Sequence, residues 1–297
     1  MLVETSRTLQ DPSGKSLYDA WKATAAREKE GGTQSSQMND SGVNDGQLAD
    51  TRIGSGSDHT VFLNFVGMPV IGLQFDGDYG VYHSGYDDFF WMNRFGDPGY
   101  KYHRLMSQLW GVTALRLANA DLLPFDFASY ASNIRQFVDE LTKGQNAQGQ
   151  SLWARAVWGR APSPGQSSEI RQPLLDLTPV LAEIDAFEAA GKTLNDSLIK
   201  KLAAGSIDPK LAERLNRGMM QVERNWLNPD GIPGRPWFKH ILYGARFTYA
   251  HLELPGLTEA VEAKDWPTAE KQAWILQRAL AKNTKLVSEL NEAARKP

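Results

Sequence analysis

The sequence predicts a mostly α-helical protein in which an α/β fragment is followed by a bundle of helices. Residues 124–297 carry four long stretches with amphipathic helical periodicity and no convincing strand. Residues 52–95 follow the order turn, helix, strand and aromatic loop, which is typical of an α/β sheet. The chain has 297 residues and 41% hydrophobic content, enough for one large domain or two ordinary ones. We place the domain boundary in the sequence DLLPFDF, so that the first domain covers 1–123 and the second covers 124–297.

The first domain is predicted to open with a short helical stretch and a long loop. Leu17, Tyr18 and Trp21 are spaced to form one buried helical face. The residues that follow are polar and rich in Gly, Ser and Asn, which predicts a flexible surface loop over 25–52.

A helix and a strand are predicted next. Ser57 or Asp58 is a suitable N-cap. The sequence MPVIGLQF at 68–75 predicts a short, fully buried strand. The helix between them carries on one face Val61, Phe62 and Phe65.

A long helix is predicted from Asp97 and Pro98 to about Asn119, because aspartate at the N-cap and proline at the first helical position are both favoured. Its apolar stripe consists of Tyr102, Leu105, Met106, Leu109 and Trp110, and continues to Leu117.

Four helices are predicted to form the bundle. Asp208 with Pro209 marks the start of the third helix, and Asp265 with Pro267 marks the start of the fourth. The apolar faces are Tyr130, Ile134, Phe137 and Leu141; Leu174, Leu177, Leu181 and Ile184; Leu211, Leu215, Met219, Val222 and Trp226; and Ile275, Leu276, Ala279, Leu280, Leu286, Val287 and Leu290.

Bulk composition excludes several classes of function. The net charge of -3 does not favour a nucleic-acid partner, and the absence of cysteine excludes thiolate chemistry and disulfides. No apolar run approaches the roughly 20 residues that span a bilayer, and the start of the chain lacks the apolar core of a signal peptide. Nine Trp and nine Tyr predict a large aromatic core, an oligomer interface, or both.

The sequence YGVYHSGYDDFFWM at 79–92 places His83 in an aromatic loop that is interrupted by glycine. His83 is either an ordered loop residue or a metal ligand, since imidazole is the commonest protein ligand for metals. One histidine does not make a zinc site, which needs three protein ligands in an enzyme. We expect the acidic pairs Asp87-Asp88 and Asp139-Glu140 to lie on solvated helix faces.

The sequence GSGSDH at 54–59 matches neither the G-x-S-x-G elbow of serine hydrolases nor a dinucleotide-binding fingerprint. Two readings stay open. The glycines could let backbone N–H groups approach a ligand, or the segment could be a helix N-cap.

Together, several motifs resemble the glutamate carboxypeptidase II and transferrin receptor family. They are GKSLYDAWK, GSGSDHTVFLNFVGMP, YGVYHSGYDDFFWMNRFGDPGYKYH, LANADLLPFDF and NPDGIPGRPWFKHILY. The resemblance covers nearly the whole chain. It implies the carboxyl-terminal remnant of an α/β zinc-peptidase domain, followed by a helical dimerisation domain.

The resemblance also implies roles for individual residues. In active members, two zinc ions activate a water that hydrolyses peptide bonds in small peptides, and His83 corresponds to the last zinc ligand. Tyr82 corresponds to a tyrosine that stabilises the tetrahedral intermediate. The positions that correspond to substrate contacts are Ser55, Gly56, Ser57 and Tyr249.

Two departures from the family pattern limit these roles. The family's other four zinc ligands and its general-base glutamate precede GKSLYDAW, where this sequence has thirteen residues. We therefore expect an incomplete metal site and no activity of the chain alone. Gly72, Gln74 and Thr248 stand where glutamate-preferring members carry basic residues, so an acidic side chain would be recognised poorly.

The expected partners follow from the same resemblance. They are a second copy of the chain through 124–297, a complementing amino-terminal peptidase half, and a peptide substrate if the enzyme is complete. The alternative is a non-catalytic homodimerisation or scaffold protein of the transferrin receptor type. Family members often work outside the cytoplasm.

Overall fold

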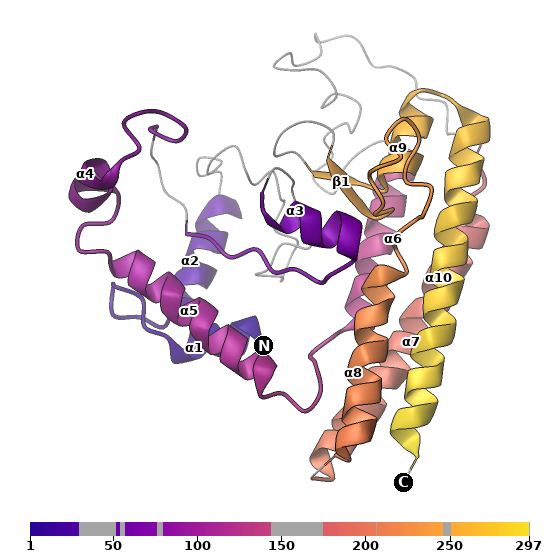
Figure 1. Cartoon of the computed structure of the whole chain (residues 1–297), viewed down its shortest axis with the longest axis horizontal. Coiled ribbons are helices and arrows are strands. Elements are labelled where there is room, and N and C mark those ends of the chain that lie inside the picture. The colour runs from indigo at the N-terminus through magenta and orange to yellow at the C-terminus, as the bar shows by residue number, and fades with distance from the viewer. Residues whose placement is uncertain are drawn as a thin grey trace. The chain divides into compact units, whose positions relative to one another are not determined.

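A computed structural model describes residues 1–29, 52–53, 57–75, 80–143, 175–205, 207–245 and 251–296. The chain divides into two compact units, one made of Met1–Asp50 with Ile71–Ala120 and the other of Thr51–Val70 with Asp121–Pro297. The predicted mostly helical fold is confirmed, as Figure 1 shows. The predicted domain boundary after residue 123 stays a prediction.

The first unit is built from helices with a small apolar core. Its elements are α1 (Leu2–Thr8), α2 (Leu17–Lys29), α4 (Phe89–Trp91), the π-helical turn η2 (Met92–Gly96) and α5 (Lys101–Ala118). Leu17, Leu105 and Leu109 are buried together and form the core. Because α2 runs to Lys29, the loop predicted over 25–52 was wrong for its first residues, and residues 30–51 lie outside the described part.

Helix α5 begins later than predicted. Its N-cap is Tyr100, in the left-handed region at φ 54°, and not Asp97. The Asp97 carboxylate nevertheless accepts hydrogen bonds from the backbone N–H groups of Tyr102 and His103, both at 3.0 Å. Asp97 therefore accepts from free N–H groups of the first turn although it lies outside the helix. The sequence predicted this capping role for Asp97, but with Asp97 as the N-cap residue itself.

The strand predicted at 68–75 is absent. This stretch is irregular, and Met68, Ile71 and Phe75 are exposed. A buried strand needs neighbours to pair its backbone groups. Among the described residues, none pairs with this segment, so its apolar residues alone do not make it a strand.

The second unit contains the bundle. Its helical elements are α3 (His59–Val61), the π-helical turn η1 (Phe62–Val66), α6 (Phe127–Lys143), α7 (Thr178–Ala203), α8 (Pro209–Arg224), α9 (Pro255–Glu262) and α10 (Trp266–Arg295). The starts predicted for α8 and α10 are confirmed, because Asp208 accepts from the Leu211 N–H and Asp265 from the Thr268 N–H. Leu174 of the predicted second face lies outside the described residues.

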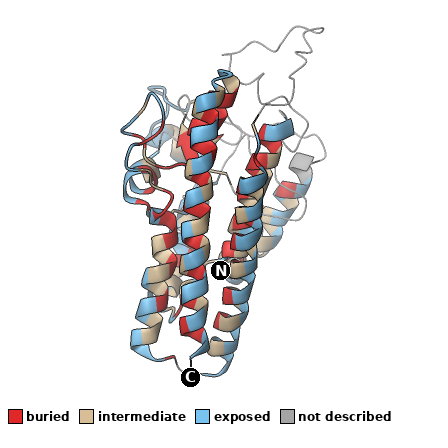
Figure 2. Ribbon diagram, turned by 90° about the vertical axis from the view of Figure 1, so that its right-hand side faces the viewer, coloured by how far each residue is buried: buried red, intermediate tan, exposed pale blue. Residues whose placement is uncertain are grey.

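One continuous core joins the helices of the bundle. Residues coloured as buried recur along the long helices in Figure 2. The largest fully buried side chains include Phe127, Phe187 and Trp226. Gly191 in α7 lets α6 approach closely, since an added Cβ would lie 2.6 Å from the Ala128 nitrogen.

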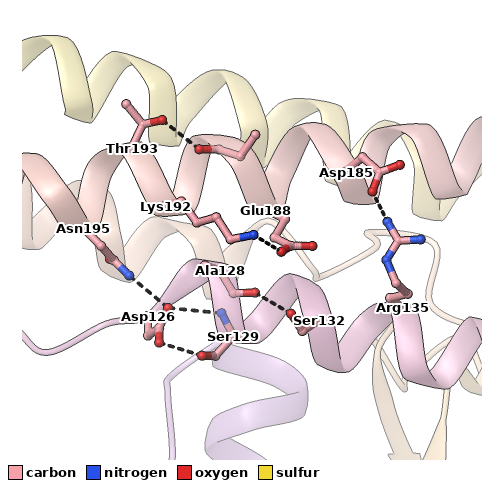
Figure 3. Close-up of polar contacts among 11 residues, drawn as sticks. Asp126, Ala128, Ser129, Ser132, Arg135, Asp185, Glu188, Lys192, Thr193 and Asn195 are labelled. Atoms are coloured by element: carbon pink, nitrogen blue, oxygen red, sulfur yellow. Dashed lines mark hydrogen bonds and ion pairs between the residues drawn. The ribbon is translucent and has the colours of Figure 1, made fainter.

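Polar contacts cover the outer side of the α6 and α7 pair, as Figure 3 shows. Asp126 accepts from the Ser129 hydroxyl at 2.6 Å and from the Asn195 amide at 3.0 Å. Burial raises the pKa of Asp126, but these hydrogen bonds outweigh burial, so its pKa lies below the usual value. Arg135 of α6 pairs with Asp185 of α7.

A short hairpin interrupts the helices of the second unit. Strands β1 (Tyr243–Ala245) and β2 (His251–Glu253) pair antiparallel, with Gly244 opposite Leu252. The expectation of no strand after Pro124 was therefore wrong. Three-residue strands are too short for an alternating pattern to be visible in the sequence.

Candidate functional site

The loop around Tyr82 and His83 lies in the first unit, before α4. The two rings stack with centroids 4.0 Å apart and an interplanar angle of 17°. His83 has φ 58°, in the left-handed region that few residues other than glycine adopt. Both side chains are exposed, Tyr82 by 43%. An imidazole and a phenol thus project together from a sharply turned backbone.

Local hydrogen bonds hold this turn. The Ser84 hydroxyl donates to the Val81 carbonyl at 2.7 Å, and the Ser84 N–H donates to the same oxygen at 3.0 Å. Asp88 is the N-cap of α4 and accepts from the Trp91 N–H at 2.8 Å. The carboxylate of Asp88 is thus used for capping, while Asp87 is exposed.

The structure brings together Tyr82 and His83 among the predicted site residues. Ser57 is exposed in the second unit, where its carbonyl accepts from the Thr60 N–H at 3.0 Å. Asp58 is the residue before α3 but makes no side-chain capping bond. Gly72 and Gln74 are exposed. The described part of the structure does not include Ser55, Gly56, Thr248 and Tyr249.

His83 does not have the further ligands that a metal needs within the described ranges. In these ranges, no group of three His, Asp or Glu side chains could hold a metal ion. Zinc in enzymes takes three protein ligands and leaves one position for water or substrate. The described residues therefore do not by themselves fit a zinc site.

A buried arginine ties three parts of the second unit together. Arg52 donates to Glu140 of α6 at 2.5 Å and pairs with Glu253 of β2 at 3.0 Å. The side chains of Arg52, Glu140 and Glu253 are 9%, 7% and 12% exposed. The guanidinium also lies 5.1 Å from the centre of the Phe137 ring. The prediction that Asp139-Glu140 forms a solvated face was thus wrong for Glu140, which is buried against this cation.

A second buried polar network surrounds Glu223 of α8. Tyr130 donates its hydroxyl to Glu223 at 3.1 Å, and the His240 Nε2 lies 2.9 Å from the same carboxylate. The His240 Nδ1 accepts from the N–H groups of Leu242 and Tyr243. The ring proton therefore lies on Nε2, which donates to Glu223.

The surroundings of Glu223 raise the pKa values of two tyrosines, Tyr130 and Tyr243. Burial raises the pKa of Tyr130, and the negative charge of Glu223 raises it further. The same two causes raise the pKa of Tyr243. Both phenols remain hydrogen-bond donors over the whole physiological range, so the network holds the start of β1 on the bundle.

Sequence reasoning missed both networks. Their members are scattered between residues 52 and 253, and no spacing rule connects Arg52 to Glu140 and Glu253. His240 lies inside the quoted motif NPDGIPGRPWFKHILY, but nothing in that motif connects it to Glu223, which lies 17 residues earlier.

The chain is similar in sequence to known proteins and to one known domain. The transferrin receptor-like dimerisation domain matches residues 175–288. A probable glutamate carboxypeptidase of Arabidopsis thaliana is 31% identical over 76% of this chain and 30% of its own length. The aminopeptidase NAALADL1 of Rattus norvegicus is 26% identical over 77% of this chain and 30% of its own.

An inactive zinc metalloprotease of Schizosaccharomyces pombe is 26% identical over 75% of this chain and 27% of its own length. Relatives named as peptidases and one named as inactive thus match to a similar extent. The chain spans about 30% of the length of the curated relatives it matches.

None of the helices in the described ranges is both long and apolar enough to cross a membrane. The bundle, the matched domain and the relatives agree on one assignment. The chain carries a transferrin receptor-like dimerisation domain at 175–288 and is similar over about three quarters of its length to glutamate carboxypeptidase-like proteins, of which it spans about 30%.

Proposed function

We propose that these 297 residues are the carboxyl-terminal part of a glutamate carboxypeptidase-like metallopeptidase. The complete enzyme would hydrolyse peptide bonds in small peptides with a water activated by two zinc ions. The observation that carries this proposal is the Tyr82 and His83 pair, exposed and stacked in the loop whose sequence resembles the peptidase motif. A pure scaffold has no evident use for this pair.

In this proposal, the two side chains have different tasks. His83 would supply one imidazole ligand, and zinc would supply a nucleophilic hydroxide at neutral pH when bound. Tyr82 would donate its hydroxyl to the oxyanion of the tetrahedral intermediate. The remaining ligands and the general base would come from outside the described residues, so the chain alone would be inactive.

The second unit would pair two copies of the chain through residues 124–297. The match to a dimerisation domain supports this role. The high aromatic content also suits a large interface, because aromatic side chains are enriched at interface cores.

The substrate would not be restricted to peptides with an acidic side chain. Gly72 and Gln74 are exposed and uncharged at positions where glutamate-preferring members carry basic residues. Thr248 is the third such position. Without a cation at these positions, a substrate carboxylate would find no charge-assisted hydrogen bond there.

The second candidate function is a non-catalytic homodimerisation protein. The inactive metalloprotease among the relatives supports it, since a matching sequence does not require activity. The two candidates differ in what they require of the Tyr82 and His83 loop. The scaffold requires nothing of this loop, whereas the peptidase requires both side chains.

The test is complementation. The chain is co-expressed with a second chain that supplies the preceding length of the Arabidopsis relative, and hydrolysis of dipeptides is measured with zinc present. We expect hydrolysis that disappears in the His83→Asn variant, because asparagine tolerates the left-handed backbone but lacks the imidazole. Hydrolysis that survives this substitution would contradict the proposed role of His83, and a dimer without hydrolysis would favour the scaffold.

A further inference from the structure

We propose that the groove beside Trp274 forms the centre of the contact between two copies of this chain. This inference rests on the dimerisation proposed above and names the surface that performs it. The groove has a volume of about 310 Å³ and lies between α10 and the segment that follows α8. Its lining combines apolar side chains such as Leu227 and Ile275 with the charged residues Asp230, Lys271 and Arg278.

Trp274 departs from the amphipathic pattern of α10. The core-facing Leu276, Leu280 and Leu290 are buried. Trp274 instead lies on the outer face and is 53% exposed. The Arg278 guanidinium lies 4.6 Å from the centre of the Trp274 ring, which holds the indole beside the groove. An exposed, positioned tryptophan next to arginine is the composition that interface centres favour.

The charges of the groove are self-complementary. Lys271 and Arg278 lie about two helical turns apart on α10, while Asp230 lies on the segment that follows α8. In a twofold contact, if one residue of the first copy meets a second residue of the other copy, the same pair forms again with the two copies exchanged. Asp230 of one copy can therefore meet Lys271 or Arg278 of the second copy, and the reciprocal pair forms at the same time. Indole and apolar lining would be buried between the two ion pairs.

The position of the groove in the sequence also points to a second copy. All lining residues fall within 225–279, inside the range 175–288 that matches a dimerisation domain. A small-molecule ligand would need no self-complementary charges, and Asp230 would repel an anion drawn to Lys271 and Arg278.

The first experiment measures the dimer dissociation constant of the full chain by sedimentation and light scattering. We expect Trp274→Ala to raise this constant at least tenfold. The matched control is Trp237→Ala, because Trp237 is 59% exposed in the same unit but does not line the groove. We expect the control to stay within threefold of the unchanged chain. Thermal unfolding of each variant checks that the bundle is intact.

The second experiment uses charge reversal. Asp230→Lys places like charges opposite Lys271 and Arg278, and the double variant Lys271→Glu with Arg278→Glu places like charges opposite Asp230. We expect each variant to dimerise at least tenfold more weakly than the unchanged chain. An equimolar mixture restores both pairs, so we expect it to form the heterodimer.

The outcomes separate the two levels of the proposal. A monomeric unchanged chain would refute the proposed dimerisation itself. A dimer that is insensitive to Trp274→Ala, or equally sensitive to Trp237→Ala, would leave dimerisation standing and overturn the assignment of the groove. Failure of the mixture to form the heterodimer would overturn the reciprocal pairing.

Discussion

At the scale of single residues, the most informative feature is the unusual backbone of His83. A β-carbon in the left-handed region costs free energy. Among the described residues, Tyr100, Leu254 and Lys264 adopt the same region as His83. The stacked Tyr82 ring and the two Ser84 hydrogen bonds hold this conformation. Sequence analysis found the two residues through a resemblance, but it could not find the backbone strain or the stacking.

Tyr82→Phe in the complemented enzyme should lower kcat by about 10- to 1000-fold, because the lost hydroxyl stabilises charge that develops in the transition state. KM should change little. The matched control is Tyr86→Phe, since Tyr86 is 78% exposed in the same loop. The measurement is steady-state kinetics on a dipeptide. An equal fall in kcat for both variants would contradict the proposed role of Tyr82.

Asp97 should make the first unit sensitive to acid. Burial raises the pKa of Asp97, but hydrogen bonds from His103 and from the backbone outweigh burial and set the pKa below its usual value. A lowered pKa stabilises the fold above the unfolded value of about 3.9, and this stabilisation is lost as pH falls through the folded pKa. Urea midpoints between pH 5 and pH 2 should therefore fall less for Asp97→Asn than for the unchanged chain.

The control for this measurement is Asp87→Asn, at an exposed aspartate of the same unit. We expect its acid dependence to match that of the unchanged chain. An equal acid response of all three proteins would contradict the role of Asp97.

At the scale of elements, amphipathic periodicity predicted the bundle helices well because each of them buries one face. It failed at 68–75 because an apolar run becomes a strand only beside another strand. It also failed at Glu140, since the burial of a carboxylate depends on Arg52, which lies 88 residues away. Tertiary partners of this kind leave no local signal in the sequence.

Arg52→Met should destabilise the second unit by about 3–5 kcal/mol, because it leaves the buried carboxylates of Glu140 and Glu253 without their cation. The control is Arg135→Met, whose ion pair with Asp185 is largely exposed on the Asp185 side. Exposed pairs contribute about 0–1 kcal/mol. Urea unfolding of both variants, followed by circular dichroism, measures the difference. Equal losses in the free energy of unfolding would contradict a stabilising role for the buried contacts of Arg52 with Glu140 and Glu253.

Gly191→Ala should destabilise the bundle by about 1–3 kcal/mol, since the new Cβ would collide with the α6 backbone at 2.6 Å. The same substitution at Gly111 in α5 meets no atom within 4 Å. Alanine favours helix over glycine by about 1 kcal/mol, so Gly111→Ala should stabilise. Free energies of unfolding with the same sign at both positions would contradict the close packing of α6 and α7.

At the scale of the whole molecule, the two units differ in the size of their cores. Among the described residues, the core of the first unit consists of three buried leucines, whereas the core of the second unit runs through all its long helices. We therefore expect amides of α5 to exchange with solvent faster than amides of α7 and α10. Hydrogen exchange followed by mass spectrometry measures this directly. Equal protection of the two units would contradict the expectation.

The chain corresponds to about 30% of the length of the relatives it matches. Motifs over nearly all of the chain predicted the resemblance to these relatives, and the helical bundle was predicted from periodicity. The complete metal site could not be predicted from these residues, because two-metal chemistry needs ligands brought together from several segments.

The most direct test of the central claim is the zinc content and peptidase activity of the purified 297-residue chain alone. After dialysis against trace-metal-free buffer and addition of excess zinc, bound metal is measured by plasma mass spectrometry and hydrolysis is measured on dipeptides. We expect no tightly bound pair of zinc ions and no hydrolysis. Two tightly bound zinc ions with dipeptide cleavage that is lost in His83→Asn would contradict this expectation, because the chain would then be a complete peptidase.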